Sequence, residues 1–461
     1  MEYMINNHWF VNNLNNFKDQ LALVHEDNEY KYDEILNKVA EYDKEIEKKI
    51  INGSVVAVIS DYSFQSISIF LSLLKKNCII VPITSKVDEE QKLRIDESNT
   101  EVIIKFENTG NLLITFNDTK INSENNLIND LRNKEAAGLI LFSSGSTGTP
   151  KAMLQNLENL CDVHKHKRPK SIVMMIFLMF DHIGGINTLL GLLMVGGVMV
   201  IPSNRDPNHV AELIQNYKVK VLPASPTFLN LLLMSDAHKK YDLSSLRMIT
   251  YGTEAMPESL LLKLRNTFKR AKLLQTFGTS ETGIAQMRSK SSESTFMKFD
   301  DPNLEYKIVD RKLYLRSATQ ISGYLNASME SFDNDGWFDT GDLAEEADDG
   351  YIKIIGRSKE IINVGGEKVL PNEVETIILE MDDVADCIVY AKSNQIMGQS
   401  VNADVVMNLD ISNREARKLI KEYCSDKLEP YKIPSSVKVV KETNFSSRFK
   451  KMRIDKDVYN S

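Results

Sequence analysis

The stretch Ser54–Pro82 reads SVVAVISDYSFQSISIFLSLLKKNCIIVP and indicates the fold class. It begins with a run of apolar, mostly β-branched residues, Ser54–Ser60, which predicts a buried strand. Phe64–Lys76 has apolar residues at helical spacing, and Cys78–Pro82 is again a short apolar run. A strand, a helix and a strand in this order predict two parallel strands joined by a crossover helix.

The same alternation continues along the first three quarters of the chain. Further short apolar runs occur at Ala136–Phe142, Val173–Phe180, Met199–Pro202, Val219–Pro223, Leu246–Tyr251 and Lys272–Phe277. Segments with helical patterning separate these runs, as in sheets that are covered by helices. We therefore expect an α/β fold whose large N-terminal domain, residues 1–358, has helix-flanked, mostly parallel sheets and a β-subdomain.

The character of the sequence changes near residue 350. The segment 351–371, YIKIIGRSKEIINVGGEKVLP, is rich in short strand-like runs and contains paired glycines. It is followed by a helix at Asn372–Glu380, strands at Ala385–Ala391 and Ser400–Met407, a helix at Asn413–Lys427 and a strand at Ser436–Val440. We expect a small α+β C-terminal domain, residues 359–461, with the boundary near Ser358 and Lys359.

Length, charge and cysteine usage limit the class of protein. The 461 residues predict more than one domain, and the net charge of −8 argues against nucleic acid as the main partner. The cysteines have no metal-ligand spacing, so we expect reduced thiols in a cytoplasmic protein. They are Cys78, Cys161, Cys387 and Cys424.

The most apolar part of the chain comprises Ser171–Phe180 and Ile183–Ile201. Asp181 and His182 interrupt it, and glycines divide its second half. These interruptions predict a strand, a loop and a helix rather than a transmembrane segment. The N-terminal sequence also lacks the charged-then-apolar pattern of a signal peptide.

Small and hydroxylated residues follow the apolar run that ends at Phe142. They are Ser143, Ser144, Gly145, Ser146, Thr147, Gly148 and Thr149, followed by Pro150 and Lys151. Glycine lets backbone N–H groups approach an anion, and the hydroxyls and the lysine add donors, so the run suggests phosphate binding. It departs from a Walker-type loop, because Pro150 replaces the second glycine and Ala152 replaces the Mg²⁺-binding Ser or Thr. An ordinary surface loop is the alternative.

Five further motifs occur in order along the chain. They are Tyr251–Glu254 (YGTE), Thr276–Glu281 (TFGTSE), Gly336–Asp342 (GWFDTGD), Gly356-Arg357 through Gly366 with Pro371–Glu375, and Pro430–Pro434. Together with the loop STGTPK, they resemble the motifs of the adenylate-forming superfamily of acyl-CoA synthetases, peptide-synthetase adenylation domains and luciferases. The resemblance extends from about Leu21 to Arg453, nearly the whole chain.

The resemblance implies a reaction in two steps. A carboxylate attacks the α-phosphorus of ATP and expels pyrophosphate, and a thiol then attacks the carbonyl of the acyl-adenylate. Cations and oriented donors must offset the repulsion between the two anions of the first step. The implied cofactors are ATP, Mg²⁺ and CoA, with the phosphopantetheine of an acyl carrier protein as the alternative to CoA. The implied substrate is a small carboxylic acid.

The resemblance also assigns the ATP site. The loop Ser143–Thr149 would hold the β- and γ-phosphates, with Lys151 beside the departing pyrophosphate. Glu281 would bind Mg²⁺, and Ser280 stands where the family more often has Thr near the α-phosphate. The other implied ATP-binding residues are Tyr251, Gly252, Thr253, Glu254, Thr276, Phe277, Gly278, Thr279, Asp342 and Arg357.

Within that set, Asp342 would accept hydrogen bonds from both ribose hydroxyls, and Arg357 would support the same sugar or a phosphate. Tyr251 and Phe277 would sandwich the adenine, although either ring fits a plain core position equally well.

The catalytic lysine is expected near the C-terminus, where the family pattern ends in Gly-Lys-x-x-Arg. Alignment on Arg453 places Lys450 in that position, with Phe449 in place of the glycine and Lys451 as the adjacent alternative. The inter-domain hinge falls on Lys359. Gly365 and Gly366 would border the arm of the thiol substrate.

The acid itself is expected near Phe180–Asn187. His182 resembles the histidine of acyl- and aryl-CoA ligases, whereas Asp181 resembles the aspartate that binds the amino group of an amino-acid substrate. The pair Gly184-Gly185 and the apolar run that follows favour an acyl or aryl acid, with Ser225 in another wall of the pocket.

Two broader alternatives stay open. One is adenylation of an amino acid or acyl group that is loaded on a carrier protein, and the other is a non-catalytic nucleotide-binding protein, which Phe449 alone favours. The basic run His164–Lys170 would either receive the 3′-phosphate of CoA or an acidic carrier protein, or form a solvated loop. The sequence does not predict the oligomeric state.

Overall fold

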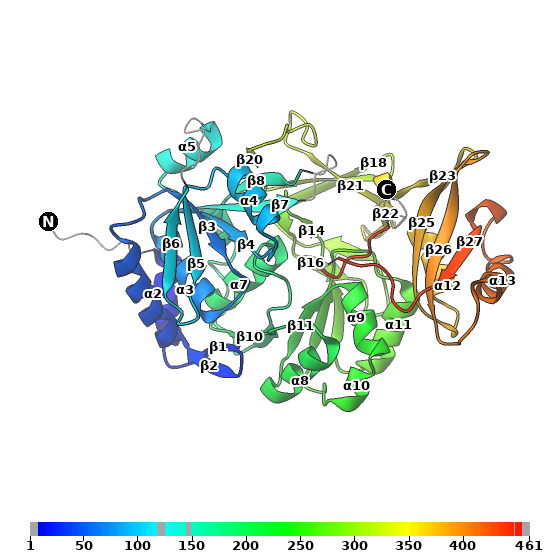
Figure 1. Cartoon of the computed structure of the whole chain (residues 1–461), viewed down its shortest axis with the longest axis horizontal. Helices are drawn as coiled ribbons and strands as arrows, with labels where there is room; N and C mark the ends of the chain where they lie inside the picture. Colours follow the sequence, from blue (N-terminus) through cyan, green and yellow to red (C-terminus); the bar gives the residue numbers. More distant parts are fainter. Residues whose placement is uncertain (1–7, 118–124, 144–148, 447, 454–461) are drawn as a thin grey trace.

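The computed structural model describes residues 8–117, 125–143, 149–446 and 448–453. A large N-terminal body contains two seven-stranded sheets and an antiparallel β-subdomain, and a smaller domain lies at the C-terminal side (Figure 1). This is the predicted architecture, an α/β body with a β-subdomain and a small α+β domain.

The first sheet has the strand order β20-β8-β7-β4-β3-β5-β6. Its strands are β3 (Val55–Ile59), β4 (Ile79–Ile83), β5 (Val102–Phe106), β6 (Leu112–Phe116), β7 (Gly138–Ser143), β8 (Lys151–Asn156) and β20 (Gly323–Tyr324). β3 pairs in parallel with β4, with Val55 opposite Ile79, and α3 (Phe64–Lys75) connects them. The sequence prediction of a strand, a helix and a parallel strand is therefore confirmed.

The second sheet has the order β13-β12-β11-β9-β10-β1-β2 and is parallel except for the β1–β2 hairpin. Its strands are β1 (Leu21–His25), β2 (Asn28–Lys31), β9 (Val173–Met175), β10 (Val198–Ile201), β11 (Val221–Ala224), β12 (Met248–Tyr251) and β13 (Lys272–Gln275). The largest apolar cluster contains residues of both sheets and of the helices α2, α3 and α7, so these helices share one core with the two sheets.

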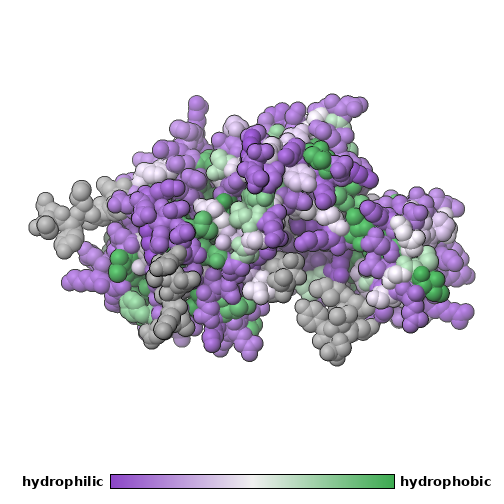
Figure 2. Space-filling model, turned by 90° about the horizontal axis from the view of Figure 1, so that it is seen from above, coloured by the Kyte–Doolittle hydropathy of each residue, from purple (hydrophilic) through white to green (hydrophobic). Residues whose placement is uncertain are grey.

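The helices of the N-terminal body are mostly short. They are α1 (Trp9–Asn13), η1 (Leu14–Phe17), α2 (Tyr32–Ile46), α3, α4 (Asp88–Glu97), α5 (Asn126–Asn133), α6 (Leu157–Asp162), α7 (Ile183–Val195), α8 (Pro207–Tyr217), α9 (Pro226–Met234), α10 (Ala237–Lys240) and α11 (Glu258–Thr267). Among the described residues, no helix is long and apolar enough to cross a membrane. The face of the molecule in Figure 2 is mostly hydrophilic, with apolar residues in small scattered groups.

β9 is shorter than the predicted run Val173–Phe180. The N–H of Ile176 still donates to the carbonyl of Val200 on β10, and from Phe177 onward side chains of other segments take the backbone hydrogen bonds. The guanidinium of Arg205 donates to the carbonyl of Phe177 at 2.7 Å, and Asp61 accepts from the N–H of Phe180 at 3.0 Å. The expected sequence of a strand, a loop and a helix is otherwise present, because β9 leads through this loop into α7.

The β-subdomain is an antiparallel sheet with the order β16-β17-β22-β21-β19-β18. Its strands are β16 (Met287–Ser289), β17 (Met297–Phe299), β18 (Leu304–Val309), β19 (Lys312–Ser317), β21 (Phe338–Glu346) and β22 (Ile352–Arg357). A hairpin of β14 (Gly278–Thr279) and β15 (Gly283–Ile284) lies between β13 and this sheet in the sequence. The short 3₁₀ helix η2 (Ser358–Glu360) follows β22, at the place where we predict the domain boundary.

In its described residues, the small domain has five strands, two α-helices and one short 3₁₀ helix. They are β23 (Ile362–Val364), β24 (Glu367–Val369), α12 (Pro371–Ile378), β25 (Val384–Asn394), β26 (Gly398–Met407), α13 (Asn413–Cys424), η3 (Pro430–Lys432) and β27 (Ser436–Val439). After β27 the chain leaves the small domain as the red ribbon in Figure 1, which reaches toward the N-terminal body and then turns back to end near β22. All four cysteines are buried and free, as predicted.

Candidate nucleotide and acid site

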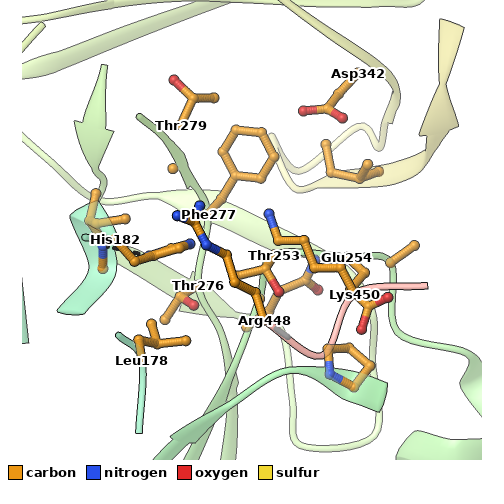
Figure 3. Close-up of a pocket in the computed structure, with 18 of the residues that line it drawn as sticks. Leu178, His182, Thr253, Glu254, Thr276, Phe277, Thr279, Asp342, Arg448 and Lys450 are labelled. Atoms are coloured by element: carbon orange, nitrogen blue, oxygen red, sulfur yellow. Dashed lines mark hydrogen bonds between the residues drawn. The ribbon is translucent and has the colours of Figure 1, made fainter. Parts of the chain in front are cut away.

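A cavity of about 1120 Å³ lies where the N-terminal body, the β-subdomain and the C-terminal segment meet. The motifs YGTE and TFGTSE reach it because they directly follow the strands β12 and β13. The carboxyl ends of parallel strands meet at one edge of a sheet, and this edge is the usual ligand site of open α/β sheets. Figure 3 shows that Thr253, Phe277 and His182 approach the cavity from the body, and Lys450 from the C-terminal segment.

Gly252 is fixed at this edge by the neighbouring strand. A Cβ atom on Gly252 would lie 2.6 Å from Oγ1 of Thr276 and 2.7 Å from its carbonyl oxygen. The backbone N–H of Thr276 donates to the carbonyl of Tyr251 at 2.8 Å, which holds the two segments together. Thr253 follows with a positive φ of 72°. At Gly252 the cavity wall is therefore formed by the backbone, without a side chain.

The predicted adenine sandwich is wrong for Tyr251. Its side chain is 1% exposed and packs in the core of the second sheet, so that it does not line the cavity. Phe277 does line the cavity, with its ring packed edge-on against Phe299. The two aromatic residues are alike in sequence, but Tyr251 is the buried last residue of β12, whereas Phe277 lies two residues beyond the end of β13.

Glu254 connects three parts of the site. Its carboxylate accepts from the backbone N–H of Thr227 at 3.1 Å, at the start of α9. The other oxygen accepts from the backbone N–H of Lys451 at 3.0 Å, on the C-terminal segment. Glu254 thus positions that segment, in addition to lining the cavity.

Asp342 and Arg357 form an ion pair on the β-subdomain. They are cross-strand partners of β21 and β22, and Nε of Arg357 lies 2.9 Å from Oδ1 of Asp342. Asp342 is 4% exposed, and this burial raises the pKa of its carboxyl to about 6, although Arg357 acts in the opposite direction. Because both residues line the cavity, a carboxylate with a fixed partner faces it.

A second carboxylate, that of Glu281, also lines the cavity. The hydroxyl of Tyr324 donates to Oε1 of Glu281 at 3.3 Å, and the Nζ of Lys151 lies 4.9 Å from the centre of the Tyr324 ring. Burial raises the pKa of Glu281, while Arg357 and Lys151 favour its charged form. The sequence analysis identified Glu281 and Lys151 but missed Tyr324, which belongs to none of the quoted motifs.

The phosphate loop is only partly described. Ser144, Gly145, Ser146, Thr147 and Gly148 lie outside the described residues. The two ends of the loop are fixed, because Ser143 and Lys151 are paired residues of the antiparallel strands β7 and β8. Both line the cavity, whereas Thr149 is exposed and does not.

The β14–β15 hairpin brings the rest of the TFGTSE motif to the cavity, and Gly278, Thr279 and Ser280 all line it. A Cβ atom on Gly278 would lie 2.4 Å from the carbonyl oxygen of Gly283 across the hairpin. The carbonyl of Ser280 accepts a hydrogen bond from the amide of Gln155 at 2.6 Å, which ties the hairpin to β8.

His182 lines the acid end of the cavity and caps α7. Its Nδ1 accepts from the backbone N–H of Gly184 at 3.0 Å. Burial, together with the charges of Lys450 and Arg448, lowers the pKa of His182 to about 3. The imidazole is therefore neutral at physiological pH and carries its proton on Nε2, so that it can donate a hydrogen bond.

Two residues predicted for the acid pocket serve other purposes. Gly185 does not line the cavity, and its close approach to the carbonyl of Met179, 2.3 Å from an added Cβ, explains the glycine. Ser225 is fully buried and caps α9 by accepting from the N–H of Phe228 at 3.1 Å. Ser225 itself therefore does not form the pocket wall, although Pro226 and Thr227 of the same predicted segment Ala224–Phe228 line the cavity, as does Gly184.

The prediction that Asp181 binds a substrate is also wrong for the described structure. Asp181 is 3% exposed and does not line the cavity. Its Oδ2 accepts from Nη1 of Arg94 on α4 at 2.8 Å and from Nη2 of Arg448 at 3.0 Å. The sequence analysis missed both arginines, because they lie 87 and 267 positions from Asp181 and no pattern near Asp181 indicates them.

The two candidate lysines face opposite sides of the C-terminal segment. Lys450 points into the cavity toward Asp342, and Arg448 lies between it and His182 (Figure 3). Burial and the charges of Arg357 and Arg448 lower the pKa of Lys450. Lys451 instead binds the small domain.

Lys451 is held by buried carboxylates. Its Nζ lies 3.4 Å from Asp386 and 3.8 Å from Glu375, and it donates to the carbonyl of Cys387. Although some of its atoms border the cavity, this ammonium is already paired. The geometry therefore favours Lys450 over Lys451 as the residue that can meet a ligand.

The residues proposed for the hinge and the thiol arm lie apart. Lys359 is exposed and borders the cavity. Gly365 and Gly366 form the turn between β23 and β24 with positive φ angles of 59° and 97°. This turn does not line the cavity, so a contact of the two glycines with a thiol arm stays a prediction.

The basic run His164–Lys170 divides into two parts. His164 is buried and its Nδ1 lies 2.7 Å from Nζ of Lys167. Lys167 and Lys170 border the same cavity as Asn187, which lies on the half-buried face of α7. The expectation of a solvated loop therefore does not describe the whole run.

Comparison with known proteins gives consistent matches over the chain. The family model for an AMP-binding enzyme matches residues 10–325, and that for an AMP-binding enzyme C-terminal domain matches residues 373–450. The 2-succinylbenzoate–CoA ligase of Staphylococcus epidermidis is 26% identical over 97% of this chain and 96% of its own length. The 4-coumarate–CoA ligase 4 of Arabidopsis thaliana is 26% identical over 70% of this chain, which spans 62% of that ligase.

Solved structures share the fold over nearly the whole chain. An anthranilate CoA ligase in complex with anthranoyl-AMP matches with a TM-score of 0.79 and 20% identity, covering 96% of this chain and 95% of that one. The o-succinylbenzoate CoA synthetase of Bacillus subtilis, in complex with its acyl-adenylate, matches with a TM-score of 0.74 and 20% identity over 96% of each chain.

Proposed function

Because the chain belongs to the AMP-binding enzyme family, we propose that it is an ATP-dependent acid–thiol ligase. It would activate a carboxylic acid as an acyl-adenylate and then transfer the acyl group to a thiol. The observation that carries this proposal is the position of Lys450, which shares one cavity with the Asp342–Arg357 pair and Glu281. The cavity thus contains a lysine that could contact the carboxylate of the acid, and charged residues that could contact a nucleotide and its metal ion.

The nucleotide would lie along the edge formed by β12, β13 and the β-subdomain. Bare backbone at Gly252 admits a flat base beside Phe277, and the buried carboxylate of Asp342 would accept hydrogen bonds from the ribose hydroxyls. Lys151 and the loop that precedes it would meet the phosphates. The sugar and the phosphates would thus contact different sheets. Asp342 and Arg357 belong to the β-subdomain, whereas the phosphate loop joins β7 and β8 of the first sheet.

Glu281 is the residue that would hold Mg²⁺. Its half-buried carboxylate is a hard oxygen ligand that accepts hydrogen bonds from the hydroxyl of Tyr324 and from its own backbone N–H. The described residues contain no group of three or more His, Cys, Asp or Glu suited to hold a metal. A cation at Glu281 would therefore depend on the phosphates of the nucleotide for its remaining ligands, which is the common arrangement for Mg²⁺.

In the first step, a carboxylate oxygen of the acid forms a bond to the α-phosphorus, and pyrophosphate leaves with the bridging oxygen. Lys450 would place a cation between the carboxylate and the α-phosphate, where two negative charges approach each other. The Nε2–H of His182 would donate to the carboxylate and orient it. The wall of α7 with Gly184 and Asn187 would receive the rest of the acid.

In the second step, the thiol sulfur forms a bond to the acyl carbonyl carbon and AMP leaves. We propose CoA as the acceptor, because CoA ligases occur among the similar sequences and the similar structures. The exposed position of Lys359 fits a hinge that lets the small domain turn between the steps. An amino-acid substrate has less support, because Asp181 is already paired with two arginines.

Exchange of labelled pyrophosphate into ATP, driven by a panel of carboxylic acids, tests the first step. We expect exchange with at least one acyl or aryl acid in the presence of Mg²⁺. A folded protein that binds ATP but shows no exchange with any acid would refute the proposal. Exchange driven by amino acids alone would instead select the carrier-protein alternative.

A further inference from the structure

Asp181 is a buried carboxylate that joins three distant parts of the chain. It directly precedes α7, and it pairs with Arg94 on α4 and with Arg448 on the C-terminal segment. The side chain of Asp181 is 3% exposed, while those of Arg94 and Arg448 are 16% and 28% exposed. Burial alone would raise the pKa of Asp181, but the two guanidinium groups outweigh it and hold that pKa below its ordinary value. The carboxylate is therefore charged, and it attracts both arginines.

Arg448 lies two residues before Lys450, on a short turn with little freedom. Phe449 between them has a positive φ of 53°, and its ring packs against Phe177 and Phe228 of the N-terminal body. Backbone hydrogen bonds at both ends close the turn. A displacement of Arg448 would therefore displace Lys450 as well.

The other side of the same segment is held by the small domain. Lys451 pairs with Asp386 and Glu375, and Arg453 pairs with Glu360 and Glu375. We therefore expect the segment to move together with the small domain. Its contacts with the N-terminal body are fewer, and Arg448–Asp181 is its ion pair with that body among the described residues.

We propose that Arg448 is a positioning residue that docks the C-terminal segment on Asp181 and so holds Lys450 in place for adenylate formation. We also propose that Arg94 makes this docking reversible. When Arg448 separates from Asp181, the carboxylate of Asp181 keeps its ion pair with Arg94. Undocking therefore does not leave a buried carboxylate without a cation. This inference rests on the proposed function, because it assigns the two arginines to its two steps.

The two arginines therefore have opposite expected effects. Arg448→Met should slow adenylate formation by about 10- to 100-fold, since a misplacement of roughly 1 Å has an effect of this size. The KM for ATP should change little, and thioester formation from supplied acyl-adenylate should stay near the wild-type rate. Arg94→Met should leave adenylate formation nearly unchanged and slow thioester formation, because on undocking Asp181 would keep the hydrogen bond from Thr84 but no cation from either arginine. Arg448→Lys should restore part of the first rate.

Amide hydrogen exchange supplies a readout that needs no activity. In Arg448→Met, the N–H groups of Phe449, Lys451 and Met452 should exchange faster, because their hydrogen bonds depend on the docked turn. In Arg94→Met they should exchange at the wild-type rate or more slowly. If the wild-type protein fails to form an adenylate, this exchange pattern still tests the docking and separates the two failures.

Several results would overturn the inference. One is an unchanged rate of adenylate formation in Arg448→Met with unchanged exchange of the turn. Another is an equal loss of both steps in both variants, which would indicate a general structural role for Asp181. A rise in the KM for the acid with an unchanged kcat would show that Arg448 binds the acid directly.

Discussion

Lys450 and Lys451 are neighbours in sequence, but the side chain of Lys450 lines the cavity and that of Lys451 pairs with carboxylates of the small domain. Lys450 faces the cavity, where burial and two nearby arginines lower its pKa. Lys451 is 9% exposed in its side chain and is paired with the buried carboxylates of Asp386 and Glu375. The first is free to meet a ligand, and the second fastens the segment to the small domain.

Replacing either lysine should therefore give different defects. Lys450→Ala should reduce pyrophosphate exchange by several orders of magnitude while ATP binding and thermal stability change little. Lys451→Met should instead destabilise the small domain by about 3–5 kcal/mol, because it leaves Glu375 and Asp386 buried without that cation. Exchange kinetics and thermal unfolding of both variants check this. The opposite pattern would place the catalytic role on Lys451.

Nucleotide binding should depend on the protonation of Asp342. Burial raises the pKa of this carboxyl to about 6, and only its charged form can accept both ribose hydroxyls. The affinity for ATP should therefore reach its full value above pH 7 and fall as the pH decreases through about 6. Calorimetric titration of ATP between pH 5 and pH 8 measures the effect.

The matched control is Asp342→Asn, since ATP itself changes its protonation in the same range. This variant should bind ATP more weakly throughout and lack the contribution of the carboxyl, so that the difference between the two profiles isolates Asp342. Parallel profiles would show that Asp342 does not contact the sugar.

Gly252 should not tolerate a side chain. A Cβ atom there would lie 2.6 Å and 2.7 Å from the side chain and the carbonyl of Thr276, so Gly252→Ala must shift β12 or β13. We expect a loss of stability of about 1–3 kcal/mol and at least a tenfold weaker ATP affinity. Gly191→Ala is the control, because the nearest atom to its Cβ is 3.5 Å away and it lies within α7. That variant should keep its ATP affinity; equal effects of both changes would remove the argument for the site.

Glu281 should govern the response to Mg²⁺. Glu281→Gln keeps the shape and the neighbour Tyr324 but loses the charge, so half-maximal exchange should need at least tenfold more Mg²⁺. ATP binding without metal should be unchanged or slightly tighter, since a negative charge near the phosphates is removed. An unchanged Mg²⁺ requirement would assign the metal to other residues.

Local sequence patterns predicted the fold because the alternation of strands and helices is set by periodicity. The strands β3 and β4 and the helix α3 deviate from the expected ranges by one residue or so. β9 was the exception, because its end is set by Arg205 and Asp61, which no local pattern around Val173 reveals.

The place of a site residue in the fold can be predicted where its motif carries its own geometry. Asp342 and Arg357 are cross-strand partners, and Gly252 lies at a strand end, so their positions follow from local structure. The predictions for Tyr251 and Asp181 were wrong because their surroundings come from distant segments, whereas Ser225 is occupied locally as the cap of α9. Asp181 and His182 illustrate this, since Arg94 on another helix decides which of the two adjacent residues reaches the cavity.

The most direct measurement follows an oxygen atom. With a carboxylic acid that is ¹⁸O-labelled in its carboxylate, ATP, Mg²⁺ and CoA, an acyl-adenylate route transfers a labelled oxygen to the phosphate of AMP when the thiol displaces it. We predict labelled AMP, unlabelled pyrophosphate and an acyl-CoA product. Label in inorganic phosphate together with formation of ADP would contradict adenylation.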